Sequence, residues 1–148
     1  MYICTKILPN YDVLQAQQSG IDLAILQSLA EIVSFISPNV ETSTIEACQN
    51  EVFTLLLKFI PKPPEDLQTD QSGDNSDLPS TQFSHVECLL FIIHQLCKFN
   101  PGYFSESKSE TFKDFKIRLQ YLARGLSINQ HFCCECVLIY CLFFISTT

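Results

Sequence analysis

The residues best suited to metal chemistry are one histidine and three cysteines near the C-terminal end of the chain: His131, Cys133, Cys134 and Cys136. Imidazole nitrogen and thiolate sulfur are the ligands that zinc prefers in structural sites. Such sites use two pairs of ligands, each pair at C-x₂₋₄-C spacing and each from a different chain segment. The four residues here lie in one segment and do not divide cleanly into two such pairs. We therefore predict that the chain holds no metal and no cofactor.

No arrangement of side chains in the sequence is typical of an enzyme. His94 is the best candidate for a general base, but neither a nucleophile nor a second ligand lies at a helical offset from it. An acid–base pair and a phosphate-binding loop are also missing at any usable spacing. We predict that His94 is a helix-surface histidine beside Glu87, and that the chain has no catalytic residues.

The chain contains eight cysteines, a number that would suit a disulfide framework in a secreted protein. Residues 1–6 do not resemble a secretory signal, because an apolar core after a basic start is missing. Cys4, Cys48, Cys88 and Cys97 instead occupy apolar positions of helical patterns. The sequence therefore predicts buried, reduced thiols.

Composition favours an all-α protein that binds other proteins. The net charge is −7, which argues against broad binding to nucleic acid, since that binding rests on Lys and Arg against phosphates. The apolar fraction is 47% and the charged fraction 17%, so we expect a large core or an unpartnered binding surface. With four Gly and seven Pro, the sequence has few of the residues that tight turns between many strands require, which favours helices.

Five helices are expected from hydrophobic periodicity and helix-ending residues. They span Tyr2–Leu8, Ile21–Ile36, Glu41–Ile60, Phe83–Lys98 and Phe112–Leu126. We expect Pro9 to end the first helix and Pro38 to end the second. In the second helix, the expected apolar face consists of Ile25, Leu29, Ile32, Val33 and Ile36. The third helix is apolar nearly all round, which is typical of a helix inside a helical stack.

The last two helices form the pair around which the chain is organised. Ser84 and Glu87 have the spacing of a capping box at the start of the first. The second carries apolar residues at intervals of 3, 4, 3 and 4, the spacing of a zipper-like seam. The seam consists of Phe112, Phe115, Leu119, Leu122 and Leu126. Ile117 and Tyr121 point away from it, which predicts contacts on two faces of this helix.

A polar stripe lies beside this seam on a helical projection. It consists of Lys113, Lys116, Gln120 and Arg124. Five of the nine basic residues lie between Lys108 and Arg124, so an acidic chain has a local positive surface. Basic residues beside apolar anchors suit a groove-type protein interface. The alternative is an ordinary solvated helix face.

Two segments differ in composition from the helices. Residues 61–82 contain four prolines, five acids and one base, so we expect an acidic Pro-rich flexible loop. Residues 127–148 form an apolar tail rich in Cys and Phe. Its apolar run Cys136–Ile145 is shorter than the roughly twenty residues that a spanning helix needs. The expected division is therefore 1–60, a helical repeat segment; 61–82, the loop; 83–126, the helix pair; and 127–148, the tail.

Several stretches resemble the apoptosis inhibitor 5 family, in the same order as in that family. The most specific are "QFSHVECLLFIIHQL" and "KDFKIRLQYLARGL", and further resemblance comes from "ILPN" and "FIPKPPED". The resemblance runs from about Tyr2 to Leu126. It implies an all-helical, HEAT- and armadillo-like solenoid of antiparallel helix pairs that serves as a protein-binding scaffold without a catalytic site. It also implies a nuclear role in the negative regulation of apoptosis, with growth-factor and chromatin-condensation proteins as partners.

The chain departs from the family pattern in three respects. The family's N-terminal repeats are absent, so we expect the chain to begin inside the array. The family has leucines at seven-residue steps, whereas this chain has Phe112, Leu119, Leu126 and Cys133. After Leu126 the family's basic nuclear-localisation tail is missing, which leaves the cytoplasm as an alternative location. The abrupt tail favours a truncated or wrongly assembled gene product over an evolved C-terminus.

Three functions remain open from the sequence. The first is a non-enzymatic anti-apoptotic interaction scaffold that binds proteins and not nucleic acid. The second is a truncated, non-functional fragment. The third is a small membrane-associated protein held by its C-terminal apolar tract, although we expect no membrane binding.

Overall fold

The computed structural model describes residues 2–17, 20–63, 82–106 and 110–128, and the regular structure in this part of the chain is entirely helical. The predicted all-α fold class is confirmed, and the packed helix pairs are those of a helical repeat fragment. The helical elements are η1 (Ile3–Ile7), η2 (Leu8–Asn10), α1 (Tyr11–Gln17), α2 (Ile21–Val33), α3 (Thr42–Phe59), α4 (Phe83–Cys97), α5 (Tyr103–Glu106) and α6 (Glu110–Ile128). Residues 64–81 of the expected loop and residues 129–148 of the expected tail lie outside the described residues.

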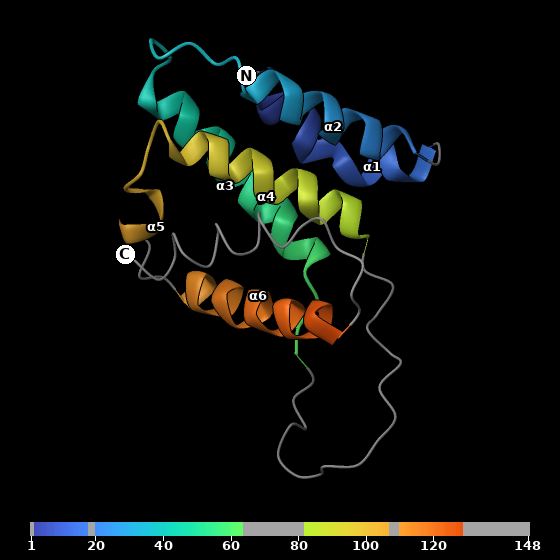
Figure 1. The fold of residues 1–148 in the computed structure, drawn as a ribbon. Helices are drawn as coiled ribbons and strands as arrows, with labels where there is room; N and C mark the ends of the chain where they lie inside the picture. Colours follow the sequence, from blue (N-terminus) through green and yellow to red (C-terminus); the bar gives the residue numbers. More distant parts are fainter. Residues whose placement is uncertain (1, 18–19, 64–81, 107–109, 129–148) are drawn as a thin grey trace, which may run out of the picture.

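The helix α4 is the centre of the fold and packs against both α2 and α3 (Figure 1). A broad face of α4 is buried, and Leu89, Ile92 and Leu96 within it are fully excluded from solvent. Burying a leucine or isoleucine side chain stabilises a fold by about 1.5–3 kcal/mol. This burial explains the run of apolar residues in α4, which leaves little polar surface for water.

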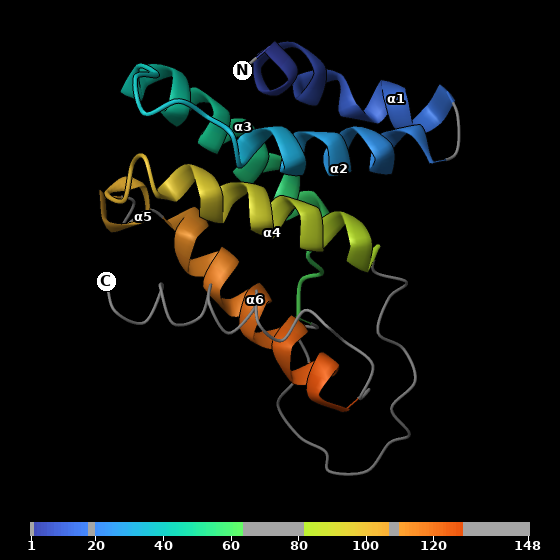
Figure 2. The same cartoon turned by 45° about the horizontal axis from the view of Figure 1, so that its top comes forward.

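The first helical elements cover one end of this assembly. The segment η1 packs on α3, and α1 packs on α2 (Figure 2). We expected Pro9 to end a helix, and this expectation was wrong. Pro9 lies in the first turn of η2, and the chain continues helically into α1. The N–H groups in the first turn of a helix have no acceptor within the helix. A proline there therefore loses no hydrogen bond, and the helical path is not interrupted.

The N-cap residue of α2 is Gly20, whose φ of 93° lies in the left-handed region that glycine adopts without strain. The helix ends at Val33, three residues before the expected Ile36. Its buried residues are Asp22, Leu26, Leu29 and Val33. The expected apolar face was therefore wrong in part, since Ile32 is 51% exposed and Ile25 and Ile36 are half-buried.

The capping box expected at Ser84 and Glu87 does not form. The N-cap residue of α4 is Gln82, and no side chain caps the helix. The carbonyl of Gln82 instead accepts the backbone N–H groups of His85 and Val86, at 2.9 and 3.2 Å. Ser84 is already inside the helix, so its hydroxyl cannot occupy the N-cap position that a capping box requires.

The four cysteines in the described part of the chain, Cys4, Cys48, Cys88 and Cys97, are all thiols rather than disulfides. Cys88 is half-buried and the other three are buried. Burial raises the pKa of the Cys97 thiol to about 11. These thiols match the reduced state that the sequence predicts.

A candidate protein-binding surface on helix α6

The helix α6 lies across the side of α3 and α4 that is remote from α1 and α2 (Figures 1 and 2). Its seam residues Phe115, Leu119 and Leu122 are buried, and Phe112 is half-buried against the core. The side chain of Leu126 lies outside the described set. This face of α6 is therefore occupied by the chain's own core.

Aromatic contacts fix α6 to the rest of the fold. The ring of Phe115 meets Phe53 of α3 edge-on, with ring centroids 5.1 Å apart. Phe104 of α5 lies 5.2 Å from Phe112 and 6.3 Å from Phe115, again between ring centroids. Phe53 also contacts Phe104 at 5.8 Å. Such aromatic pairs contribute about 0.5–1.5 kcal/mol each beyond their buried area, so the cluster orients α6 strongly.

Arg118 provides a polar attachment between α6 and α3. Its Nη1 donates to the carbonyl oxygens of Leu57 and Ile60, at 3.0 and 3.2 Å, where α3 ends. Its Nε and Nη2 bind Oδ2 of Asp114, one turn earlier in α6, at 2.8 and 2.6 Å. The Arg118 side chain is only 11% exposed. A cation at the C-terminal carbonyls of a helix complements the negative end of the helix dipole.

Asp114 is held in its charged form by this arrangement. The hydrogen bond from Arg118, followed by the charges of Arg118 and Lys62, lowers the pKa of the Asp114 carboxyl despite some burial. The carboxylate in turn keeps the guanidinium aimed at α3. The role of Arg118 in attaching α6 to α3 was not identified from the sequence. The signal that could have pointed to its ion pair is the i, i+4 spacing of Asp114 and Arg118, which is typical of a helical ion pair.

The outer face of α6 carries the residues that the sequence groups as a stripe. Lys113, Lys116 and Gln120 are exposed, and Lys113 makes only a surface ion pair with Glu110, at 3.3 Å. The side chain of Arg124 lies outside the described set. Ile117 is 54% exposed on the same face, next in sequence to Lys116. The sequence predicts contacts on a second face of this helix through Ile117 and Tyr121; Ile117 is exposed and Tyr121 is half-buried.

We name Lys113, Lys116, Ile117 and Gln120 the α6 outer face. An exposed isoleucine beside two exposed lysines combines an apolar anchor with positive charge, as groove-type protein interfaces do. The ion pair between Lys113 and Glu110 is weak, since ion pairs exposed to this degree contribute about 0–1 kcal/mol to stability. Lys113 therefore stays available to a partner.

A second buried polar group joins the N-terminal half of the fold and was not expected from the sequence. Nε2 of His85 in α4 lies 3.0 Å from Oδ2 of Asp22 in α2, and both side chains are about nine-tenths buried. Phe59 of α3 stacks on the His85 ring at 5.1 Å, and Tyr11 of α1 meets Phe59 edge-on at 5.8 Å. The pair lies within the packing of four helices, so it has a structural role.

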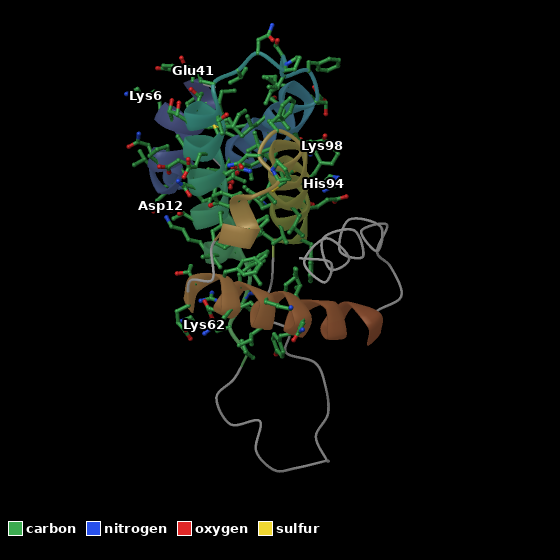
Figure 3. All side chains as sticks on the ribbon, turned by 90° about the vertical axis from the view of Figure 1, so that its left-hand side faces the viewer. Lys6, Asp12, Glu41, Lys62, His94 and Lys98 are labelled. Atoms are coloured by element: carbon green, nitrogen blue, oxygen red, sulfur yellow. The ribbon has the colours of Figure 1, made fainter. Side chains whose placement is uncertain are left out.

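His94, which the sequence predicts to be a helix-surface residue and not a catalytic one, is half-buried on α4. Figure 3 shows it on the same side of α4 as Lys98. Burial, followed by the positive charge of Lys98, lowers the pKa of His94. Among the described residues there is no cluster of three or more His, Cys, Asp or Glu that could hold a metal ion. The zinc-like cluster at 131–136 lies outside the described residues.

Comparison with known proteins identifies the family of this chain. The family model described as apoptosis inhibitory protein 5 (API5) matches residues 1–131. The chain belongs to the apoptosis inhibitory protein 5 family. The resemblance found in the sequence is thereby confirmed.

Relatives in the family come from vertebrates and an insect. The chain is 42% identical over 130 residues to apoptosis inhibitor 5-B of Xenopus laevis, and 39% identical over 130 residues to apoptosis inhibitor 5 of Homo sapiens. Each match covers 86% of this chain and 24% of the relative. The Drosophila melanogaster homolog is 36% identical over 132 residues, covering 84% of this chain and 23% of the relative. The chain thus spans about a quarter of the length of these relatives.

In the part of the chain that the structure describes, no helix is both long and apolar enough to cross a membrane.

Proposed function

We propose that this chain is a non-enzymatic protein-binding scaffold of the apoptosis inhibitory protein 5 family, acting in the negative regulation of apoptosis. The relatives carry the name apoptosis inhibitor, which supports the general role. HEAT- or armadillo-like stacking, a nuclear location, and growth-factor and chromatin-condensation partners are the finer parts of the proposal. They rest on the family resemblance.

One observation supports the choice of surface: the seam of α6 is buried in the fold, whereas its outer face is exposed. The apolar seam faces the chain's own core, with Phe115, Leu119 and Leu122 buried. A zipper that pairs this seam with another protein would require α6 to leave α3 and lose the aromatic cluster. The α6 outer face needs no such rearrangement, because its lysines and Ile117 are already exposed.

The roles of the α6 residues divide accordingly. Phe112, Phe115, Leu119 and Leu122 hold the packing, and Arg118 fixes α6 to the end of α3. The stripe of Lys113, Lys116, Gln120 and Arg124 orients an acidic partner surface, and its positive charges raise the association rate constant. Ile117 provides the apolar contact at the centre.

A charge-reversal experiment tests this surface. Lys113→Glu with Lys116→Glu should weaken binding of the full chain to a purified chromatin-condensation partner by tenfold or more at low salt. The difference from the unchanged protein should shrink as salt screens the charges. Lys6→Glu with Lys98→Glu is the matched control, since it makes the same change in net charge at exposed positions remote from α6 (Figure 3).

Two outcomes would contradict the proposal. In one, both pairs of substitutions weaken binding equally, so that only the net charge matters. In the other, the Lys113/Lys116 pair has no effect at low salt, so that the α6 outer face is ordinary solvated surface. The helical circular dichroism of each variant should match that of the unchanged chain.

The competing interpretation is a truncated fragment without function. It predicts that the folded chain binds no family partner, with or without substitutions. The binding measurement on the unchanged chain therefore separates the two interpretations before any variant is made.

A further inference from the structure

The thiols of Cys4 and Cys48 meet in the core, although 44 positions separate them in the sequence. Cys4 belongs to η1 and Cys48 to α3, two elements that pack on each other. Both side chains are fully excluded from solvent, and they share a hydrogen bond. A disulfide between them requires the two sulfur atoms to approach to about 2.05 Å.

We propose that Cys4 and Cys48 form a reversible redox site, at which a peroxide oxidises the two thiols to a disulfide that ties the N-terminal helical segment to α3. This site is independent of the α6 outer face. It lies at the other end of the fold, where η1 and η2 cover α3.

The two sulfur atoms differ in chemical character. Donation of the shared hydrogen bond, followed by burial, raises the pKa of the Cys4 thiol, whereas acceptance of that bond lowers the pKa of Cys48. Thiolate is the form that reacts with peroxides. The reaction is accordingly written with Cys48 as the sulfur that meets the peroxide and Cys4 as the resolving thiol beside it.

The chemistry balances with hydrogen peroxide as the oxidant. In the first step the Cys48 sulfur forms an S–O bond as the O–O bond breaks, and the released hydroxide takes the Cys48 proton to give water. In the second step the Cys4 sulfur forms the S–S bond to Cys48 as the S–O bond breaks, and the departing hydroxide takes the Cys4 proton to give a second water. The two thiols lose two electrons in total, and these reduce one peroxide.

Access to the buried pair comes from local opening of the N-terminal segment. Apart from Cys4, that segment buries Leu8 and Tyr11, and an exposed ion pair joins Asp12 to Lys58 of α3 at 2.8 Å. An exposed ion pair of this kind holds the segment weakly. Segments held by few buried side chains open more readily than a whole domain unfolds, so peroxide reaches Cys48 in the opened form. Once the disulfide forms, the segment can no longer lift away.

Peptide mapping of the full chain tests the proposal directly. Trypsin cleaves after Lys6 and Lys58, and no Lys or Arg lies between them. The reduced chain is treated with hydrogen peroxide in native buffer, blocked with iodoacetamide and digested. We expect peptides 1–6 and 7–58 to be cross-linked as the main disulfide product, and the link to be lost with dithiothreitol. We also expect the oxidised chain to unfold at a midpoint higher by roughly 5 °C or more, since the bond closes a long loop.

Single substitutions provide the controls. Cys48→Ala should remove the cross-link and the rise in midpoint, whereas Cys88→Ala, at a half-buried thiol of α4, should leave both unchanged. A native sample in which Cys48 links mainly to other cysteines, or is oxidised to sulfinic acid without a link, would overturn the proposal. A pattern of links in native buffer that equals the pattern in urea would overturn it as well. The mapping of the unchanged chain decides the question even if Cys48→Ala fails to fold.

Discussion

His85 and Asp22 form a nearly buried pair that joins α4 to α2, with Nε2 of His85 3.0 Å from Oδ2 of Asp22. Neither residue resembles a core residue in the sequence, yet both side chains are about nine-tenths buried where α2 packs on α4. Removing one partner leaves the other buried without its hydrogen bond.

The first prediction concerns this pair. Asp22→Ala should lower the free energy of unfolding by about 1–3 kcal/mol, because the His85 ring loses its partner in the interior. Urea unfolding followed by circular dichroism measures the change. In a double-mutant cycle with His85→Ala, the combined loss should be clearly smaller than the sum of the single losses. Additive losses would mean that the two side chains do not interact in solution.

The second prediction concerns acid. Burial raises the pKa of Asp22, but hydrogen bonds from the Leu23 backbone and from His85 outweigh it, so the pKa lies below its ordinary value of 3.8. A carboxyl with a lowered folded pKa stabilises the fold above its unfolded pKa, and this contribution is lost as the pH falls through the folded pKa. Stability should therefore decline from about pH 4 downward, measured by urea unfolding at successive pH values. Asp22→Asn should flatten that decline, and an equally steep decline in the variant would contradict the assignment.

The third prediction concerns Arg118. Arg118→Lys should destabilise the chain by about 1.5–3 kcal/mol, because an ammonium cannot reach Asp114 and the two carbonyls of α3 together. Lys113→Ala is the control on the same helix and should change stability by less than about 0.5 kcal/mol. Thermal unfolding of both variants measures the difference. Equal stability of Arg118→Lys and the unchanged chain would show that the guanidinium fork is not needed.

The fourth prediction separates the two faces of α6. Leu119→Ala should cost about 2–5 kcal/mol, since Leu119 is fully buried. Ile117→Ala, two positions earlier and 54% exposed, should stay within about 0.5 kcal/mol of the unchanged chain. Denaturant unfolding midpoints compare the two. A larger loss from Ile117→Ala would place the core on the other side of α6.

The sequence predicts α2, α3, α4 and α6 well, and the seam as far as Leu122, because periodic apolar positions carry that signal locally; it misses the short helices α1 and α5. It predicts helix ends less well. Gln82 displaced Ser84 as the N-cap residue, and Pro9 proved compatible with a continuing helix, because both outcomes depend on how neighbouring turns pack.

Contacts between distant segments are the part that the sequence could not supply. The i, i+4 spacing suggests that Arg118 binds Asp114, but its bonds to Leu57 and Ile60 depend on where α3 ends in space. The pairing of Asp22 with His85 likewise depends on the crossing of α2 and α4. No local pattern encodes a contact of that kind.

Lysine labelling tests the central claim, that α6 binds proteins through its outer face while its seam stays in the core. The full chain, alone and with a purified chromatin-condensation partner in excess, is treated briefly with an amine-reactive reagent, and modification of each lysine is measured by mass spectrometry. Lys113 and Lys116 should lose several-fold in reactivity when the partner binds, while Lys6 and Lys98 should not change. Protection of Lys6 and Lys98 with unchanged reactivity at Lys113 and Lys116 would contradict the account.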